Sequence, residues 1–200
     1  MVFLDWAKAF DRMKTDTLLV ALTRFGFPSK VVNIIGAIYR ERRFFVQDHS
    51  GKSSLFSQRA GIAQGCPLSP FLFIVVQSVM FHDIQAKLEL EAEPLFVVTR
   101  ELLYADDTVL MSSSQRNLQQ LIDAVAAEGA TYGLEINWDK TFQMSICTGS
   151  AVHRPDGTEL ERKREIVYLG GLITSDGRVS RELSRRVGEG RSILNKLRQL

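Results

Sequence analysis

Two adjacent carboxylates, Asp106 and Asp107, occupy a short polar break between two apolar runs of the chain. Neighbouring carboxylates repel each other, so holding them together is costly unless a cation lies between them. Mg²⁺ is a hard cation that takes carboxylate oxygens and usually shares its coordination with substrate phosphates and water. A third carboxylate, Asp5, ends another apolar run and is available to complete such a site. These residue types point to metal-assisted phosphoryl transfer, in which the ions activate the attacking oxygen and neutralise the leaving phosphate.

The Asp106-Asp107 pair also has an ordinary explanation, because aspartate is common in turns. For the dipeptide alone that explanation is the better one. The apolar runs that end at Tyr104 and resume at Thr108 weaken the turn explanation without removing it. The residues around the pair must therefore decide between a simple turn and a metal site.

The elements that would position the carboxylates follow an α+β order along the chain. Residues 2–4 predict a buried strand ending at Asp5, and residues 96–104 and 108–111 predict a hairpin with the acidic pair at its turn. We expect an antiparallel sheet with helices packed on one face. The other expected elements are helices over residues 15–25, 29–40, 70–88, 114 onward and 179–197, a hairpin over 43–47 and 54–59, strands over 141–146 and 166–173, and a surface loop over 151–163.

Two of these helices have expected N-caps, Ser69 before Pro70 and Ser114 before the later helix.

Charge is uneven along the chain. The formal net charge is only +2, which by itself gives no argument for a nucleic-acid partner. Residues 162–200, however, carry ten Lys/Arg against four Asp/Glu. A basic segment of this kind suits contact with phosphate, and it suits a solvated helix face equally well.

The composition excludes several other classes of protein. A hydrophobic share of 45% and a charged share of 24% indicate a globular chain with a real core. Cys66 and Cys147 make neither a disulfide framework nor a zinc site, and the three histidines share no ligand spacing. The longest apolar run, residues 71–81, is far short of the ~20 residues of a membrane span. No secretory signal opens the chain, so we expect an intracellular protein, nuclear or cytoplasmic, without a membrane partner.

Five segments resemble, in order, the motifs of reverse transcriptases, especially those of the non-long-terminal-repeat (LINE-like) retrotransposon type. They are residues 3–11 (FLDWAKAFD), 61–70 (GIAQGCPLSP), 104–107 (YADD), 133–137 (GLEIN) with Lys140-Thr141, and 168–171 (YLGG). Any one of these motifs is weak evidence, whereas five in family order are specific. The resemblance implies a polymerase palm over residues 1–175, the start of a helical thumb over 176–200, and a fragment of a retrotransposon polyprotein.

The resemblance also implies roles for particular residues in the two-metal chemistry. Asp5 and Asp106 would bind two Mg²⁺ ions, or Mn²⁺ in their place, with help from Asp107. The backbone carbonyl of Trp6 would be a further ligand. Lys140 matches the lysine of the fourth motif and would serve as general acid for the departing pyrophosphate, although a surface lysine after a turn is an equal alternative.

The remaining matched residues would contact the substrates, which are an RNA template, a DNA primer and deoxynucleoside triphosphates. Phe10 would pack beneath the incoming sugar and block a ribose 2′-hydroxyl. Gln64 and Gly65 would contact the incoming nucleotide and the templating base. The segment formed by Tyr168, Leu169, Gly170 and Gly171 would position the primer terminus.

Two departures from the family pattern bear on activity. The chain starts at the first palm motif, so the fingers region that precedes it in the family is missing or partial, and the chain stops inside the first thumb helix. We therefore expect the isolated chain to extend a primer poorly or not at all. Ala63 occupies a position where the retrotransposon type often has Arg or Pro, which affects the nucleotide contacts.

Two alternative functions compete with polymerisation. One is a catalytically inactive remnant that persists as an RNA-binding or structural module. The other is an RNA-directed RNA polymerase, which Phe10 disfavours, as does Ala105, because viral enzymes of that kind usually have glycine at the Ala105 position.

Overall fold

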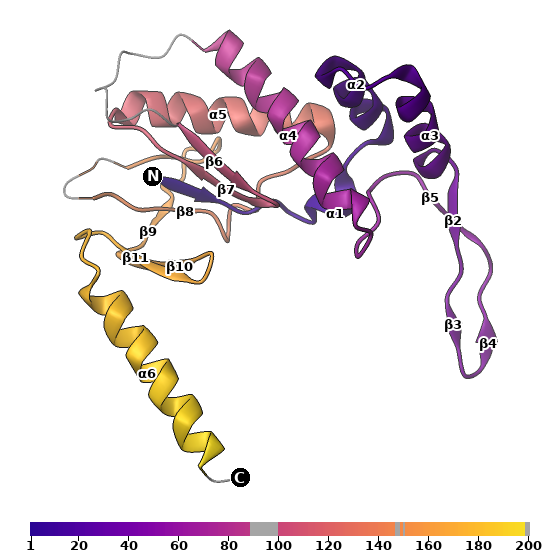
Figure 1. Ribbon diagram of the computed structural model, residues 1–200. Coiled ribbons are helices and arrows are strands. Elements are labelled where there is room, and N and C mark those ends of the chain that lie inside the picture. The colour runs from indigo at the N-terminus through magenta and orange to yellow at the C-terminus, as the bar shows by residue number, and fades with distance from the viewer. Residues whose placement is uncertain (89–99, 147–148, 150, 199–200) are drawn as a thin grey trace.

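A five-stranded sheet in the order β6-β7-β1-β8-β9 lies at the centre of the molecule (Figure 1). The computed structural model describes residues 1–88, 100–146, 149 and 151–198. The strands are β1 (Val2–Leu4), β6 (Glu101–Tyr104), β7 (Asp107–Leu110), β8 (Phe142–Gln143) and β9 (Glu161–Arg162). β1 is the central strand and all three of its residues are buried, as expected for an apolar run with a neighbour on each side.

The prediction of a purely antiparallel sheet is wrong at one edge, where β8 and β9 pair in parallel. The expected surface loop over residues 151–163 accordingly returns to the sheet and ends in β9. The buried side chain of Gln143 explains this return. Its oxygen accepts a hydrogen bond from the backbone N–H of Val152 at 3.0 Å, and its amide donates to the carbonyl of Leu160 at 3.1 Å. One polar side chain thus replaces backbone partners that the loop would otherwise need.

The two faces of the sheet pack against different partners, because successive strand residues point in opposite directions. Val2 and Leu4 belong to the main core beneath the helices α4 (Leu68–Lys87) and α5 (Gln115–Tyr132). Phe3 points the other way, into a smaller apolar cluster. That cluster is covered by the hairpin of β10 (Glu165–Tyr168) and β11 (Gly171–Thr174) (Figure 1). The expected placement of the helices on one face is confirmed.

The segment after β1 forms three helices that lie beside the sheet. It contains α1 (Ala9–Arg12), α2 (Thr15–Phe25) and α3 (Ser29–Tyr39), and α2 packs against α4. The expected helices over 15–25 and 29–40 are confirmed. The expected hairpin is confirmed too and projects from the body (Figure 1). Its strand pairs are β2 (Arg42–Phe44) with β5 (Phe56–Gln58) and β3 (Gln47–Asp48) with β4 (Gly51–Lys52).

The helix starts follow the sequence in one case and not in the other. Ser114 caps α5, because its side chain accepts a hydrogen bond from the Asn117 N–H. Ser69 does not cap α4, which already begins at Leu68. The Ser69 hydroxyl is buried and donates to the Ala63 carbonyl at 2.6 Å, so it ties the preceding loop to the helix instead.

α4 is the one described helix whose length and apolar composition would suffice to cross a membrane. More than half of its apolar window is buried inside the fold, where it forms part of the main core.

The remaining expectations need smaller corrections. The strand expected over 141–146 is limited to β8, and the run over 166–173 forms the β10–β11 hairpin rather than one strand. Residues 96–99 of the strand expected over 96–104 lie outside the described residues, and its last four residues form β6. The last expected helix is confirmed as α6 (Ser180–Leu197), which extends away from the sheet and has no buried residue (Figure 1).

Candidate active site

Strand register brings Asp5 and Asp107 to the same place. β1 pairs antiparallel with β7, with Leu4 opposite Thr108. The next residue of β1's chain, Asp5, and the preceding residue of β7, Asp107, therefore lie beside each other. Asp106 precedes Asp107 in the turn of the β6–β7 hairpin. The alternation along both strands directs Asp5 and Asp107 to the face that carries Phe3, which is the face covered by β10 and β11.

The three carboxylates act on one another electrostatically. Partial burial raises the pKa of Asp107, and the negative charges of Asp106 and Asp5 raise it further. Among the residues that the structure describes, no three Asp, Glu, His or Cys side chains form a ready-made metal cage. Asp106 and Asp107 are exposed and Asp5 is partly buried, so the three form an open concentration of negative charge rather than a closed cage. This arrangement fits a divalent cation that takes its other ligands from substrate phosphate and water.

The segment after α5 completes the surroundings of Asp5. The Lys140 ammonium lies 3.7 Å from an Asp5 carboxylate oxygen, and the Asn137 side-chain amide donates to the same oxygen at 3.4 Å. The Asn137 N–H also donates to the Asp5 carbonyl at 2.8 Å, and the Thr141 hydroxyl accepts from the Asp5 N–H at 3.4 Å. Lys140 is 72% exposed, so its head group remains free to reach a substrate. Sequence reasoning assigned no role to Asn137 or Thr141, although both stand in the fourth motif.

A buried polar contact lies on the opposite face, directly beneath the carboxylates. The indole N–H of Trp6 donates to the Thr108 hydroxyl at 3.1 Å, and the Gln77 amide of α4 donates to the same oxygen at 3.3 Å. Trp6 follows Asp5 in the chain and Thr108 follows Asp107, so this contact links the two acidic segments to each other and to α4. Sequence reasoning considered only the backbone carbonyl of Trp6 and missed the contact.

Thr108→Val should lower the Tm of the chain by roughly 3–10 °C. Valine keeps the shape of threonine but leaves the buried Trp6 and Gln77 donors without their acceptor, which costs about 1–3 kcal/mol. Differential scanning calorimetry measures the effect, and Thr108→Ser, which retains the oxygen, is the matched control. Equal Tm values for the valine and serine variants would show that the hydroxyl is dispensable.

The loop of the second motif is fastened to the first motif. The Gly61 N–H donates to the Met13 carbonyl at 2.8 Å, and the Ile62 N–H donates to the Phe10 carbonyl at 2.6 Å. Gly61 has φ +94°, and a Cβ there would come within 2.7 Å of the Asp11 carbonyl oxygen. Only glycine allows this close approach.

This fastening places the expected nucleotide-binding residues in one neighbourhood. The Gln64 amide donates to the Asp11 carboxylate at 3.0 Å, and Gly65 follows with φ +81°. Phe10 is half-buried, and its ring centroid lies 5.2 Å from that of Phe73 on α4. Phe10, Gln64 and Gly65 therefore lie on connected segments, immediately after Asp5 in the chain.

The β10–β11 hairpin brings Tyr168 close to the carboxylates. Its ring packs edge-on against Phe3 at 5.5 Å. Burial raises the pKa of the Tyr168 hydroxyl, and the charge of Asp107 raises it further. The hydroxyl is buried and finds no hydrogen-bond partner among the described residues. Leu169 and Gly170, with φ +47° and +78°, form the turn beyond it and lead to Gly171, the first residue of β11.

Comparison with known proteins gives one family for nearly the whole chain. The profile of the family described as reverse transcriptase (RNA-dependent DNA polymerase) matches residues 1–173. Relatives in Drosophila melanogaster include the retrovirus-related Pol polyprotein of the type-2 retrotransposable element R2DM, with 29% identity over 88% of this chain and 18% of the relative. Another is the probable RNA-directed DNA polymerase from transposon BS, with 31% identity over 90% of this chain and 20% of the relative. The chain thus spans about a fifth of the length of these relatives.

Solved structures of telomerase share the fold. Apo telomerase from Candida tropicalis, truncated from the C-terminal domain, superposes with a TM-score of 0.62 at 18% identity, over 87% of this chain and 33% of the telomerase chain. Telomerase from Candida albicans in complex with a fragment of telomeric RNA gives a TM-score of 0.61 at 18% identity, over 88% of this chain and 29% of the other. The expected α+β fold of a polymerase palm is confirmed.

Proposed function

This chain belongs to the reverse transcriptase family, and on that premise we propose that it catalyses RNA-directed DNA synthesis, adding deoxynucleotides to a primer 3′ end. One observation carries the proposal. Strand pairing sets Asp5 beside Asp107 at an open, negatively charged site that Lys140 borders at 3.7 Å. A site of this kind is suited to phosphoryl transfer, where positioning and charge neutralisation provide most of the catalysis.

The donor set fits divalent cations, because mutual repulsion among three carboxylates is relieved when a cation is bound. Asp5 and Asp106 would hold two Mg²⁺ ions, with Asp107 and the Trp6 carbonyl as additional ligands. Such ions supply Lewis acidity toward the phosphate and lower the pKa of the attacking hydroxyl. Asn137 holds one Asp5 oxygen by its side chain and the Asp5 carbonyl by its N–H, which restricts the rotation of this carboxylate.

The other residues of the chain act on substrate and proton. Lys140 carries its proton on Nζ, beside Asp5, and would give it to the departing pyrophosphate. Phe10 would pack against the sugar of the incoming deoxynucleotide, and Gln64 and Gly65 would border the nucleotide and its templating base. The turn at Tyr168–Gly171 would hold the primer terminus against the same face of the sheet.

Primer extension on an RNA template tests the proposal. The chain, in its full reading frame, should extend a DNA primer with deoxynucleotides in the presence of Mg²⁺ and stop when EDTA is added. A DNA template and ribonucleoside triphosphates serve as comparison arms. Binding of the primed template without any extension would refute the enzymatic proposal and support the alternative of an RNA-binding module.

A further inference from the structure

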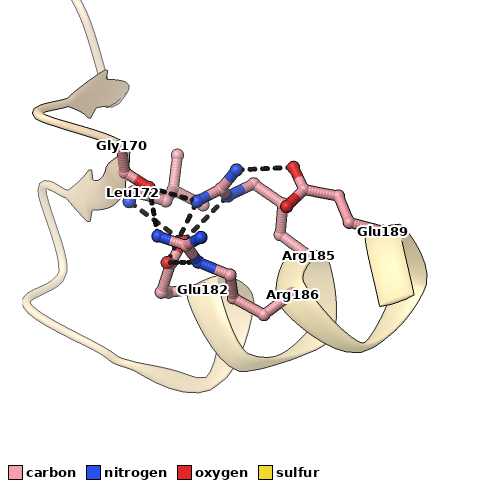
Figure 2. Close-up of polar contacts among 6 residues, drawn as sticks. All are labelled: Gly170, Leu172, Glu182, Arg185, Arg186 and Glu189. Atoms are coloured by element: carbon pink, nitrogen blue, oxygen red, sulfur yellow. Dashed lines mark hydrogen bonds and ion pairs between the residues drawn. The ribbon is translucent and has the colours of Figure 1, made fainter. Parts of the chain in front are cut away.

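α6 is held to the rest of the molecule by polar contacts, because none of its residues is buried. Arg181 binds Glu165 at the start of β10 at 2.7 Å, and a larger set of contacts joins the helix to the turn between β10 and β11 and the residue pair that follows it. Figure 2 shows the residues of this larger set, with two guanidinium groups and one carboxylate converging on the turn. They are Gly170, Leu172, Glu182, Arg185, Arg186 and Glu189.

Gly170 in the turn accepts one hydrogen bond from each guanidinium group, and Leu172 in β11 donates one to the carboxylate. Arg185 donates to the Gly170 carbonyl at 2.7 Å, and Arg186 donates to the same oxygen. The Leu172 N–H donates to the Glu182 carboxylate at 2.9 Å. The backbone atoms on both sides of Gly171 are therefore bound by side chains of α6.

Glu182 is the centre of this network. Its carboxylate accepts from Arg185 Nε at 2.8 Å and from Arg186 Nε at 2.7 Å, besides the backbone bond from Leu172. These donors, with Arg185 foremost, lower the pKa of Glu182 to about 2. The carboxylate thus orients both guanidinium groups toward Gly170 while it binds the turn itself.

The turn needs such support because its backbone is unusual. Leu169 has φ +47°, a backbone conformation that residues other than glycine rarely adopt, and Gly170 follows with φ +78°. Conformations of this kind persist only where the surroundings determine them from several sides. The contacts from α6 supply one such side, and the packing of Tyr168 on Phe3 supplies the other.

We propose that Glu182, Arg185 and Arg186 are positioning residues that fix the 168–171 turn for the primer terminus and make this turn move with α6. The inference rests on the proposed function, because it assigns the turn to the primer. It adds that the arginines act through the turn and not chiefly as phosphate ligands. Arg185 already gives Nε, Nη1 and Nη2 to Glu182, Glu189 and Gly170, which leaves little of its donor capacity for a nucleic acid.

Glu182→Gln separates these two roles, because they predict opposite results. The substitution removes a negative charge, so a helix that only attracts phosphate should bind every duplex more tightly. A positioning network should instead lose its preference for a primer end. We expect the ratio of affinities for a recessed DNA primer on an RNA template over a blunt duplex of equal length to fall about fivefold or more.

Fluorescence anisotropy at fixed salt measures the ratio in the full chain. Arg191→Gln is the matched control, since it removes one charge from the same helix outside the network. It should weaken both duplexes alike and leave the ratio unchanged. Glu182→Asp retains the charge and should restore part of the ratio.

Amide hydrogen exchange at Leu172 reports on the turn without any nucleic acid. Glu182→Gln should accelerate this exchange and leave the strands β1 and β7 unaffected. An unchanged affinity ratio together with faster exchange would overturn the proposal, as would a wild-type chain with no preference for a recessed end. Failure of the proposed function is distinguished from both, because it appears as absent extension by the wild-type protein in its full reading frame.

Discussion

Asp106→Asn is expected to reduce primer extension by about a thousandfold or more. Asparagine keeps the shape of the side chain but removes the negative charge that would hold the metal ions. Loss of metal-supplied charge stabilisation costs several kcal/mol in the transition state, and each 1.4 kcal/mol is a factor of ten in rate. Single-turnover extension by the protein in its full reading frame, at saturating Mg²⁺, measures the loss.

Asp123→Asn is the matched control. Asp123 lies on α5 and accepts a hydrogen bond from Gln119 one turn earlier at an exposed position, so the same chemical change there should leave the rate unaltered. Mn²⁺ titration followed by electron paramagnetic resonance gives an independent reading of the metal site. Wild-type rates and wild-type Mn²⁺ binding in Asp106→Asn would remove Asp106 from the site.

Local patterns were sufficient to predict the strands that bring the carboxylates together. The apolar run before Asp5 and the runs on either side of Asp106-Asp107 each contain a strand among the described residues. The motifs of the family then supply their pairing, which local sequence cannot. The fold class and the placement of helices on one face follow from the same patterns and are confirmed by the structure.

Contacts between segments that are distant in the chain could not be predicted from the sequence. Hydrogen bonds from the Gln143 side chain hold residues 152 and 160 against the sheet, and the chain then forms the parallel strand β9. Nothing in the sequence of residues 151–163 distinguishes them from a surface loop. Ser69 has the residue type and the position of an N-cap, yet its hydroxyl donates a hydrogen bond to the Ala63 carbonyl instead. In both cases a side chain satisfies a backbone group that only the folded chain brings within reach.

The site shows the same division between local and distant information. Trp6 and Thr108 are neighbours of predicted site residues, but their hydrogen bond depends on the register of two strands separated by about half the chain. The basic face of α6 was consistent with phosphate contact, whereas Arg185 and Arg186 bind the turn at Gly170. Residue type indicated the charge, and tertiary structure determined what the charge contacts.

Backbone strain gives a signal that sequence patterns do not contain. Among the described residues, three that are not glycine have a positive φ, namely Lys8, Ala105 and Leu169. Each stands in a different one of the motifs, and such conformations cost on the order of 1–3 kcal/mol. Strain of this kind persists where the surrounding structure determines the conformation, and it is concentrated at functional sites. Its distribution here agrees with the proposed site, to which each of the three motifs contributes a segment.

Phe10→Val is expected to raise the use of ribonucleotides relative to deoxynucleotides by about tenfold to a hundredfold. In the proposed site the Phe10 ring lies against C2′ of the incoming sugar, where a ribose hydroxyl would be buried without a partner. An unsatisfied hydroxyl costs ~1–3 kcal/mol, and 1.4 kcal/mol corresponds to a factor of ten. One side of the ring packs on Phe73, and Phe10 as a whole is only half-buried, so part of it remains available to a substrate.

Competition between ribonucleoside and deoxynucleoside triphosphates in one extension reaction, run with the protein in its full reading frame, measures the change directly. Mg²⁺ dependence should stay as in the wild type, because Phe10 holds no metal. Phe27→Val is the matched control. Phe27 is also a partly buried ring on the main core, but it lies between α2 and α3 and contacts Phe25 of α2 and Phe71 of α4. If both variants lose stability and neither alters the choice of sugar, Phe10 is a packing residue and selection against ribose lies elsewhere in the site.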